Sequence, residues 1–344
     1  MQKQNKPRIL AQSRKEIWRS VGSLIWTVDA NSPGQDAALS ILKTLFDQPR
    51  WLEAYHLYDE RGSQLFEKIC ALPEYYLTRT ENAILAKEAA RIIAAAPVEC
   101  IVELGAGTSK KTLHLLREQV RQRQRGTFAP IDVSLTDLTV SRNTILNQLP
   151  QFDFCGLQAR YEEGISSIEK SLPTLFVFLG STVGNFNHSE FVRFFDHLSQ
   201  SMGPEDFLLL GVDRIKEADT LEKAYNDSQI VTAEFILNVF CNVNRLLGGN
   251  FDLSKMRYHS WYNPEWQQVE MYGVSTSDQE ITLASRALSF VWERGEKILV
   301  EISRKFEPDR LQKQLQCFGL KPIAHFTDPR DWFSLLLFKK SAEQ

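Results

Sequence analysis

Residues 100–112 read Cys-Ile-Val-Glu-Leu-Gly-Ala-Gly-Thr-Ser-Lys-Lys-Thr, an apolar run that ends in an acidic residue and opens directly into a Gly-x-Gly turn. Ile101 and Val102 are typical of a buried parallel strand. Gly105 and Gly107 allow positive φ and a close approach of ligand to backbone. The stretch therefore predicts a strand that delivers a nucleotide-like ligand to the start of a helix.

This turn departs from the phosphate-binding form of the motif, which carries a third glycine. Lys110 occupies that position, and the helix is expected to begin near it, with Thr108 or Ser109 as the N-cap. Because the third glycine and its pyrophosphate cradle are missing, the loop favours a cofactor without phosphates, such as S-adenosylmethionine. A tight turn without any ligand is the alternative that the loop alone leaves open.

A second strand is predicted at residues 129–133, Ala-Pro-Ile-Asp-Val. Asp132 falls about where a doubly wound fold presents a carboxylate to the two hydroxyls of a ribose. A solvated aspartate at a strand end is the alternative. The spacing of Asp132 after the glycine turn favours the binding role.

Composition sets the class of protein. The chain has 344 residues, 43% of them hydrophobic, so it can bury a large core in one large domain or two intertwined ones. A net charge of −3 argues against a dedicated nucleic-acid binder. Four arginines between Arg117 and Arg125 are expected at a solvated helix end.

Cysteine and histidine usage predicts neither a disulfide framework nor a metal site. The five cysteines are scattered and never form Cys-x-x-Cys, and the histidines show no metal-ligand spacing. No stretch approaches the ~18 apolar residues of a membrane span, and the N-terminal residues lack an apolar signal core. We expect a cytoplasmic protein with no membrane partner.

The order of elements predicts an α/β fold. Further strands are expected near 174–180 and 207–213, with helical patterns between them, as in a parallel sheet. Residues 1–79 have a mostly helical and irregular pattern. After Asp213 the rhythm breaks: 214–248 is helical in pattern and 257–305 alternates like strands, before a last strand near 333–338. The first domain is thus interrupted by an insertion.

Several blocks follow one another along most of the chain. They are Tyr58–Ser63 with Leu65 and Phe66, Leu72–Tyr76, Thr78–Glu81, the glycine turn at 103–109, Gly180–Asn185, Ala224 and Tyr225 with Val231–Ala233, and Glu301–Phe306. In this order they resemble the ergothioneine-pathway L-histidine Nα-methyltransferases, a family that also includes fungal N-methyltransferases of tryptophan derivatives.

The resemblance implies two domains. A Rossmann-like class I methyltransferase domain that binds S-adenosylmethionine would comprise 80–213 and 306–344. A second α+β domain that binds the substrate would be built from the N-terminal segment 1–79 and the insertion 214–305.

The resemblance also implies the roles of individual residues. S-adenosylmethionine would contact Gly105, Lys111, Asp132 and Val133, with Tyr58 and Phe66 near it or at the entrance. The α-amino and carboxylate groups of the amino acid would contact Thr182, Asn185 and Tyr225. The imidazole would contact Glu301 and Ser303, with Met271 in the same pocket and Tyr75 close by.

Glu301 and Ser303 favour histidine over tryptophan. A carboxylate and a hydroxyl two residues apart on a strand point to one face, so both can reach the two nitrogens of one ring. An indole is larger and offers one donor, which would leave a buried charge poorly paired. The alternative for each site residue is an ordinary structural role: core aromatics for the tyrosines, core packing for Met271, and a solvated strand face for Glu301 and Ser303.

Some positions depart from the family pattern. Ala106 and Lys110 stand where Ser and Glu are usual. Arg160 replaces an aspartate whose carboxylate would accept the adenine amino group, a loss of about 1–3 kcal/mol if that donor is buried unpaired. Glu162 or Glu163 substituting through a register shift, and adenine held by backbone and stacking, are the two alternatives.

The expected reaction is three successive methyl transfers to the α-nitrogen of histidine, giving the betaine hercynine. Each attack needs an unprotonated amine, and Tyr58 is the candidate for relaying the proton. Two other functions are left open: methylation of a different amino acid or amine, and a non-catalytic binding protein weakened by Arg160. A monomer is expected.

Overall fold

The computed structural model describes residues 9–10, 18–28, 33–169 and 172–341. The chain divides into two compact units, each assembled from separate stretches. Unit 1 consists of Met1–Asp29, Leu77–Arg214 and Phe306–Gln344, and unit 2 of Ala30–Tyr76 and Ile215–Lys305.

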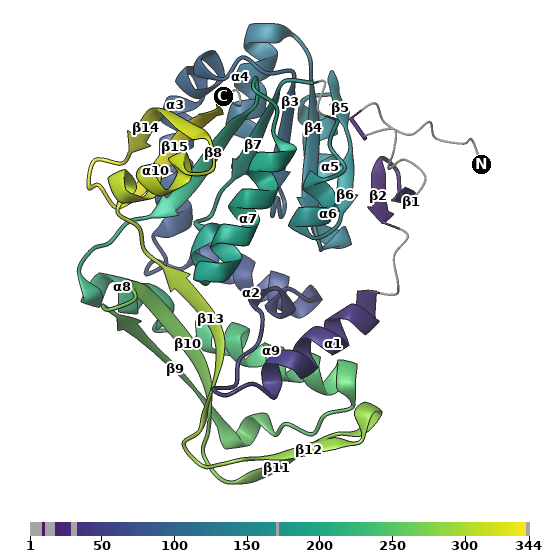
Figure 1. Ribbon diagram of the computed structural model, residues 1–344, viewed down its shortest axis with the longest axis vertical. Coiled ribbons are helices and arrows are strands. Elements are labelled where there is room, and N and C mark those ends of the chain that lie inside the picture. Colours follow the sequence, from purple (N-terminus) through teal and green to yellow (C-terminus); the bar gives the residue numbers. More distant parts are fainter. Residues whose placement is uncertain (1–8, 11–17, 29–32, 170–171, 342–344) are drawn as a thin grey trace. The chain divides into compact units, whose positions relative to one another are not determined.

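Unit 1 is built on a large mixed sheet (Figure 1). Its strands are β1 (Trp18–Gly22), β2 (Ile25–Val28), β3 (Cys100–Leu104), β4 (Gly126–Asp132), β5 (Phe152–Phe154), β6 (Gly156–Gln158), β7 (Thr174–Phe178), β8 (Phe207–Asp213), β14 (Leu320–Thr327) and β15 (Phe333–Lys340). The strand order is β1-β2-β6-β4-β3-β7-β8-β15-β14, with β5 paired to β4. The strands from β2 to β8 pair in parallel along this order, and β15 returns antiparallel to β8.

Continuous apolar sequence explains the centre of this sheet. Every residue of β3, β7 and β8 is buried, as expected for parallel strands covered on both faces. The strands predicted around residues 100–104, 129–133, 174–180, 207–213 and 333–338 are all confirmed.

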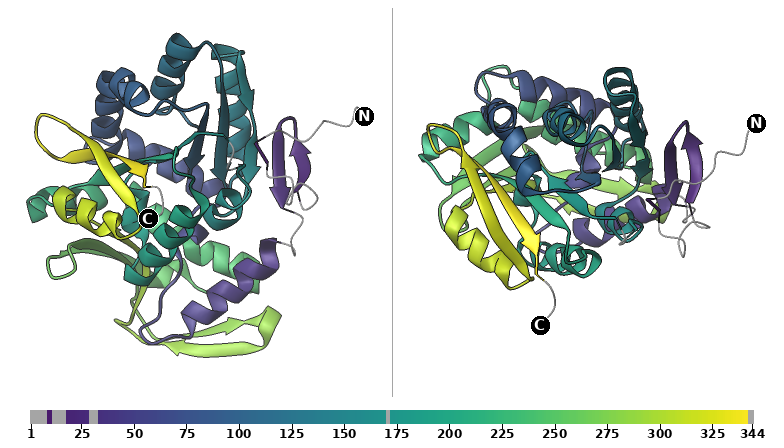
Figure 2. Two further views of the ribbon diagram at one scale, coloured as in Figure 1. Left: turned by 45° about the horizontal axis from the view of Figure 1, so that its top comes forward. Right: turned by 90° about the horizontal axis from the view of Figure 1, so that it is seen from above.

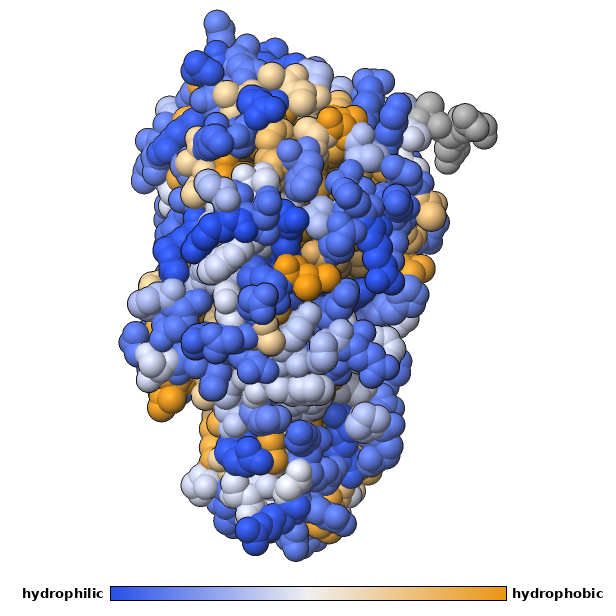
Figure 3. Space-filling model, turned by 90° about the vertical axis from the view of Figure 1, so that its left-hand side faces the viewer, coloured by the Kyte–Doolittle hydropathy of each residue, from blue (hydrophilic) through white to orange (hydrophobic). Residues whose placement is uncertain are grey.

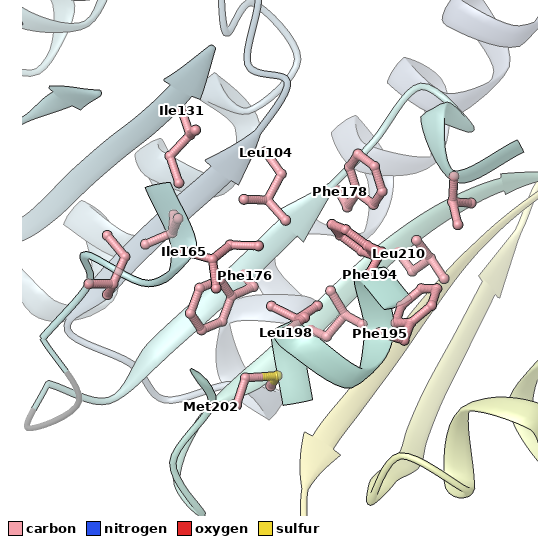
Figure 4. Close-up of a cluster of buried hydrophobic side chains, with 14 of the residues drawn as sticks. Leu104, Ile131, Ile165, Phe176, Phe178, Phe194, Phe195, Leu198, Met202 and Leu210 are labelled. Atoms are coloured by element: carbon pink, nitrogen blue, oxygen red, sulfur yellow. The ribbon is translucent and has the colours of Figure 1, made fainter. Parts of the chain in front are cut away.

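Helices cover both faces of the sheet (Figure 2). They are α3 (Leu77–Ala95), α4 (Leu113–Arg123), α5 (Leu135–Gln148), α6 (Tyr161–Ile165), η3 (Thr182–Asn185), α7 (His188–Ser201) and α10 (Pro308–Gln316). On the face covered by α6, α7 and α10, Phe194 of α7 packs against Phe178 of β7 with ring centroids 5.0 Å apart. Phe195 and Leu198 of α7 and Phe176 of β7 belong to the same buried cluster (Figure 4). This cluster fixes the helix that follows β7 against the strand.

The hairpin formed by β1 and β2 differs from the expected division of the chain. The sequence predicts that residues 1–79 belong to the second domain, with a mostly helical and irregular structure. Instead, β2 pairs in parallel with β6 and extends the sheet of unit 1 at its edge (Figure 2). Trp18 is buried and donates from Nε1 to Ser167 Oγ at 3.0 Å, which anchors the hairpin.

The expected start of the helix after the glycine turn is wrong. The turn continues beyond Lys110, and α4 begins at Leu113 after Thr112. Ser109 adopts a left-handed φ of 54°, which a helix cannot include, and its Oγ lies 2.8 Å from Ser141 Oγ. The turn is therefore longer than the sequence suggested.

The carboxyl ends of β3, β4 and β7 lie next to one another in the sheet. From β3, helix α4 leads to β4 on one side; from β4, the chain passes through β5, β6 and α6 to β7 on the other. This reversal of direction is where open α/β sheets bind ligands. The site residues of unit 1 follow these strand ends.

Unit 2 combines helices with two antiparallel sheets. Its helices are α1 (Pro33–Leu45), η2 (Ala54–Leu57), α2 (Glu60–Ala71), α8 (Ala218–Tyr225), α9 (Val231–Leu247), η4 (Leu253–Lys255) and η5 (Ala284–Arg286). Its strands are β9 (Met256–Asn263), β10 (Gln268–Ser275), β11 (Gln279–Leu283), β12 (Leu288–Trp292) and β13 (Lys297–Arg304). They form a sheet of order β13-β10-β9 and the hairpin β11–β12.

Helix α9 is the centre of unit 2. Phe235, Ile236, Val239, Phe240 and Val243 recur at helical spacing and are all buried. Polar residues of the same helix hold the preceding chain: Asn238 donates to Asp59 Oδ1 at 2.9 Å, and Asp59 caps α2 by accepting from Gly62 N at 2.8 Å. The Tyr58–Ser63 block thus encodes a capped helix start.

The face drawn in Figure 3 is mostly hydrophilic, with apolar residues in small separate groups. Among the described residues, no helix combines the length and the apolar character that crossing a membrane requires.

Candidate active site

In unit 1, the glycine turn and Asp132 form one hydrogen-bonded group. Gly105 and Gly107 have φ of 67° and 49°. Gly107 N donates to Asp132 Oδ2 at 2.8 Å, and Ser134 N donates to the other oxygen at 2.9 Å. A Cβ placed on Gly107 would meet no atom within 4 Å, so the turn borders open space. The carboxylate is fixed where the ends of β3 and β4 meet.

Burial shifts the acidity of the two carboxyls beside this turn. It raises the pKa of Asp132 to about 6, against the opposing effect of hydrogen bonds from the N–H groups of Ser134 and Gly107. It raises the pKa of Glu103 to about 7, against an opposing hydrogen bond from Thr112. Perturbed carboxyls of this kind are typical of functional sites.

Lys111 is held by a glutamate that the sequence analysis did not assign. Glu81 on α3 is fully buried and forms an ion pair with Lys111 Nζ, whose side chain is 24% exposed. The same carboxylate accepts from Gly180 N at 2.8 and 3.0 Å. Glu81 therefore connects the turn after β3 with the turn after β7. Its only sequence signal was its place in the Thr78–Glu81 block.

The turn after β7 carries Thr182 and Asn185 in η3. Ser181 has a left-handed φ of 57°, and its buried Oγ accepts from Asp213 N at 2.9 Å. Thr182 Oγ1 donates to Leu179 O at 2.9 Å and lies 3.2 Å from the position of a Cβ on Gly180. Thr182 thus faces Gly180 at the same strand ends as the glycine turn. Val133 directly follows β4, with 39% of its surface exposed.

Tyr161 is a second residue that the sequence analysis did not assign to the site. Its hydroxyl lies 2.9 Å from the position of a Cβ on Gly105, and its ring packs edge-on against Phe178 with centroids 5.4 Å apart. Arg160, immediately before it, is exposed at the N-terminus of α6, where its N–H donates to Glu163 Oε2 at 3.3 Å. Glu162 and Glu163 are both exposed.

Replacing Gly105 with alanine is expected to destabilise the ligand-free protein by about 2–3 kcal/mol, since left-handed backbone strain adds to a collision with the Tyr161 hydroxyl. Gly107→Ala shares the strain without the collision and is expected to cost about 1 kcal/mol. Denaturant unfolding measures both. Adding Tyr161→Phe to Gly105→Ala is expected to recover part of the loss; equal losses for the two glycines would contradict the collision.

In unit 2, Glu301, Ser303 and Met271 share one face of the sheet. Met271 pairs with Glu301 across β10 and β13, and Val269 pairs with Ser303. All three site side chains are buried. The expectation that the carboxylate and the hydroxyl point the same way from a strand is confirmed.

Tyr225 at the end of α8 reaches the same face. Its hydroxyl oxygen lies 2.8 Å from Ser303 Oγ, and both oxygens accept from Lys305 Nζ, at 2.7 and 2.8 Å. Lys305 is 3% exposed, and no pattern in the sequence predicts a role for it. Tyr258 Oη donates to Tyr225 O at 2.5 Å and holds the end of the helix.

Aromatic rings extend from Tyr225 through unit 2. Tyr75 packs edge-on against Tyr225 at 5.9 Å, Phe66 against Tyr75 at 6.4 Å, and Tyr58 against Phe66 at 5.6 Å between centroids. Burial, together with the neighbouring Tyr225, raises the pKa of Tyr75 well above its usual value, so its hydroxyl is neutral. Tyr58 and Phe66 are half-buried.

The family of this chain follows from a match over most of its length. Residues 37–340 match the family described as histidine-specific methyltransferase, SAM-dependent. The chain belongs to this family.

Three relatives show how far the similarity of this histidine-specific methyltransferase extends. It is 36% identical to the histidine N-alpha-methyltransferase of Mycolicibacterium smegmatis over 90% of this chain and 98% of that one. It is 34% identical to the protein of that name from Mycobacterium tuberculosis, with the same coverage. It is 28% identical to ergothioneine biosynthesis protein 1 of Neurospora crassa, covering 85% of this chain but 34% of the fungal protein.

The predicted site residues of this methyltransferase fall into two sets. Gly105, Lys111, Asp132, Val133, Thr182 and Asn185 lie at the strand ends of unit 1, and Tyr58, Phe66, Tyr75, Tyr225, Met271, Glu301 and Ser303 lie in unit 2. The unit 1 set fits S-adenosylmethionine, the cofactor of the family: the turn leaves open space at Gly107, and Asp132 lies beside it as an acceptor.

Proposed function

We propose that this enzyme transfers three methyl groups in succession from S-adenosylmethionine to the α-nitrogen of L-histidine. The product would be hercynine, the first intermediate of ergothioneine biosynthesis. The observation that carries the choice of substrate is the buried pair Glu301 and Ser303 on one face of β13. A carboxylate and a hydroxyl at this spacing match the two nitrogens of an imidazole.

The residues of unit 1 would hold the cofactor, which supplies a methyl group already activated on a sulfonium. Asp132 would accept hydrogen bonds from the ribose hydroxyls, and the glycine turn would let the nucleoside lie against backbone. Glu81 would keep Lys111 in place beside them. These groups would bind the cofactor and orient its methyl group; they would not take part in the methyl transfer itself.

The substrate's amine must meet neutral partners. A carboxylate next to it would stabilise the ammonium form, which has no lone pair for the attack. Thr182, Asn185 and Tyr225, the residues proposed to hold the amino and carboxylate groups, are all uncharged. Tyr58 is proposed to relay the proton that each methylation releases. The neutral ring of Tyr75 would favour the methylated cation by cation–π contact.

Mass spectrometry tests this proposal most directly. Purified enzyme is incubated with S-adenosylmethionine and all twenty amino acids together. A gain of three methyl groups on histidine alone supports the proposal. A gain of one or two would show that the product is not the trimethylated betaine. Methylation of another amino acid would reject the Glu301 and Ser303 pocket, and no methylation would favour a binding protein.

Cofactor affinity is expected to depend on the charge of Asp132. The carboxylate form accepts the ribose hydroxyls, so affinity is full above the pKa of about 6 and falls as the pH drops through it. Calorimetric titration with S-adenosylhomocysteine is expected to show a Kd that rises up to about tenfold per pH unit below that value. Asp132→Asn is expected to bind weakly with little pH dependence; an unchanged dependence in this variant would assign the effect to another group.

The monomeric state and the cytoplasmic location stay predictions. Light scattering during size-exclusion chromatography measures the first.

A further inference from the structure

Lys305 is a buried cation that the proposed reaction does not yet use. It follows β13 directly, and its N–H donates to Gln267 O at 2.7 Å. Its Nζ donates to Tyr225 Oη at 2.7 Å and to Ser303 Oγ at 2.8 Å, and these two oxygens are 2.8 Å apart. We call Tyr225, Ser303 and Lys305 the hydroxyl triangle.

The hydrogen bonds of the triangle restrict what Ser303 can offer a ligand. An ammonium group has donors only, so both hydroxyl oxygens accept from Lys305. If Tyr225 donates to Ser303, both lone pairs of Ser303 are used and only its O–H can reach a ligand. If Ser303 donates to Tyr225, Ser303 keeps one lone pair and can only accept from a ligand.

Histidine's ring distinguishes these two arrangements. A neutral imidazole has one N–H, for the Glu301 carboxylate, and one bare nitrogen, which needs a donor. An imidazolium has two N–H groups and needs two acceptors. It would also place a positive charge two hydrogen bonds away from the Lys305 ammonium, and like charges repel strongly in a buried environment. The first arrangement and the neutral ring are therefore favoured together.

We propose that Lys305 determines specificity by making Ser303 a hydrogen-bond donor, so that the pocket binds histidine with a neutral ring and its N–H toward Glu301. This inference rests on the proposed function, because it takes histidine as the substrate. Lys305 is a positioning residue: it acts on the ring through Ser303.

Nitrogen-15 NMR of labelled histidine tests the inference on the unaltered enzyme. The spectrum is recorded at pH 6 with S-adenosylhomocysteine present, below the free ring's pKa of about 6.5. One protonated and one bare ring nitrogen in the bound state support the inference. Two protonated ring nitrogens would overturn it.

Calorimetric titration of histidine into variants tests the role of Lys305 itself. Lys305→Met and Ser303→Ala are each expected to raise the Kd about tenfold or more, and the double variant is expected to be little worse than either, because both remove one coupled interaction. Effects that multiply in the double variant would overturn the coupling. In Lys305→Met, the bound ring is expected to become protonated at pH 6.

Lys216→Met is the matched control. Lys216 Nζ donates to Tyr76 Oη at 2.7 Å in the same unit, outside the triangle. This variant is expected to keep the histidine Kd within about twofold and the ring neutral. If Lys305→Met does not fold, the spectrum of the unaltered enzyme decides alone. Methylation of a different amino acid by the unaltered enzyme would reject the proposed function, whereas a protonated ring on a methylated histidine would reject only this inference.

Discussion

Replacing Glu301 with alanine is expected to lower kcat/KM for histidine by about a hundredfold, since a hydrogen bond to a charged acceptor contributes about 1.5–3 kcal/mol. Glu301 is buried on β13 beside Ser303, and the variant would leave the ring N–H without an acceptor. Steady-state methylation measures the loss. Titration with S-adenosylhomocysteine is expected to show unchanged cofactor binding, which separates a lost substrate contact from unfolding.

Glu270 provides the control in the same sheet. It is also buried, but it pairs with Ile302 rather than Glu301 and so lies on the opposite face. Its carboxylate accepts from Asn263 at 2.9 Å and from Gln268 at 2.8 Å. Glu270→Gln is expected to reduce stability while leaving kcat/KM within about twofold. If Glu301→Ala retained histidine activity at the level of Glu270→Gln, the imidazole pocket would lie elsewhere.

Replacing Glu81 with alanine is expected to destabilise unit 1 by about 3–5 kcal/mol, because it breaks a buried ion pair and leaves a buried N–H without its acceptor. Glu81 is fully buried, pairs with Lys111 and accepts from Gly180 N. Scanning calorimetry is expected to show a fall in Tm of about 10 °C.

Glu88 on the same helix is the matched control for Glu81. Its partners Lys87 and Arg91 have side chains that are 75% and 73% exposed, so Glu88→Ala is expected to cost at most about 1 kcal/mol. Glu81→Gln keeps an acceptor for Gly180 N but removes the charge. Its fall in Tm is expected to lie between those of Glu88→Ala and Glu81→Ala. Equal Tm values for Glu81→Ala and Glu88→Ala would show that the Glu81 network contributes little.

The elements predicted correctly are those whose signal is local. β3, β7 and β8 are continuous apolar runs, so a short window of sequence identifies each of them. The hairpin β1–β2 was missed because its burial comes from β6, about 130 residues further along the chain. The start of α4 was missed because Ser109 adopts a left-handed φ and contacts Ser141, 32 residues further along the chain, which no local pattern indicates.

The same distinction applies to the site. Glu301 and Ser303 could be paired from the sequence because strand alternation places them on one face. Glu81 could not be assigned, since its partner Gly180 lies 99 residues away and only the sheet topology brings them together. Lys305 is one of 40 basic residues, and its burial against Tyr225 depends on where α8 ends, which no local pattern encodes.

The position of β15 has a consequence for how the protein is made. This strand lies inside the sheet, between β8 and β14, although it is far from β8 in the sequence. Until the ribosome has released it, the edge of β8 has no partner, although every residue of that strand is buried in the finished protein. An unpaired apolar strand edge invites association with other chains, and such late, distant pairing slows folding. Nascent chains that lack β15 would therefore expose the edge of β8 to other chains.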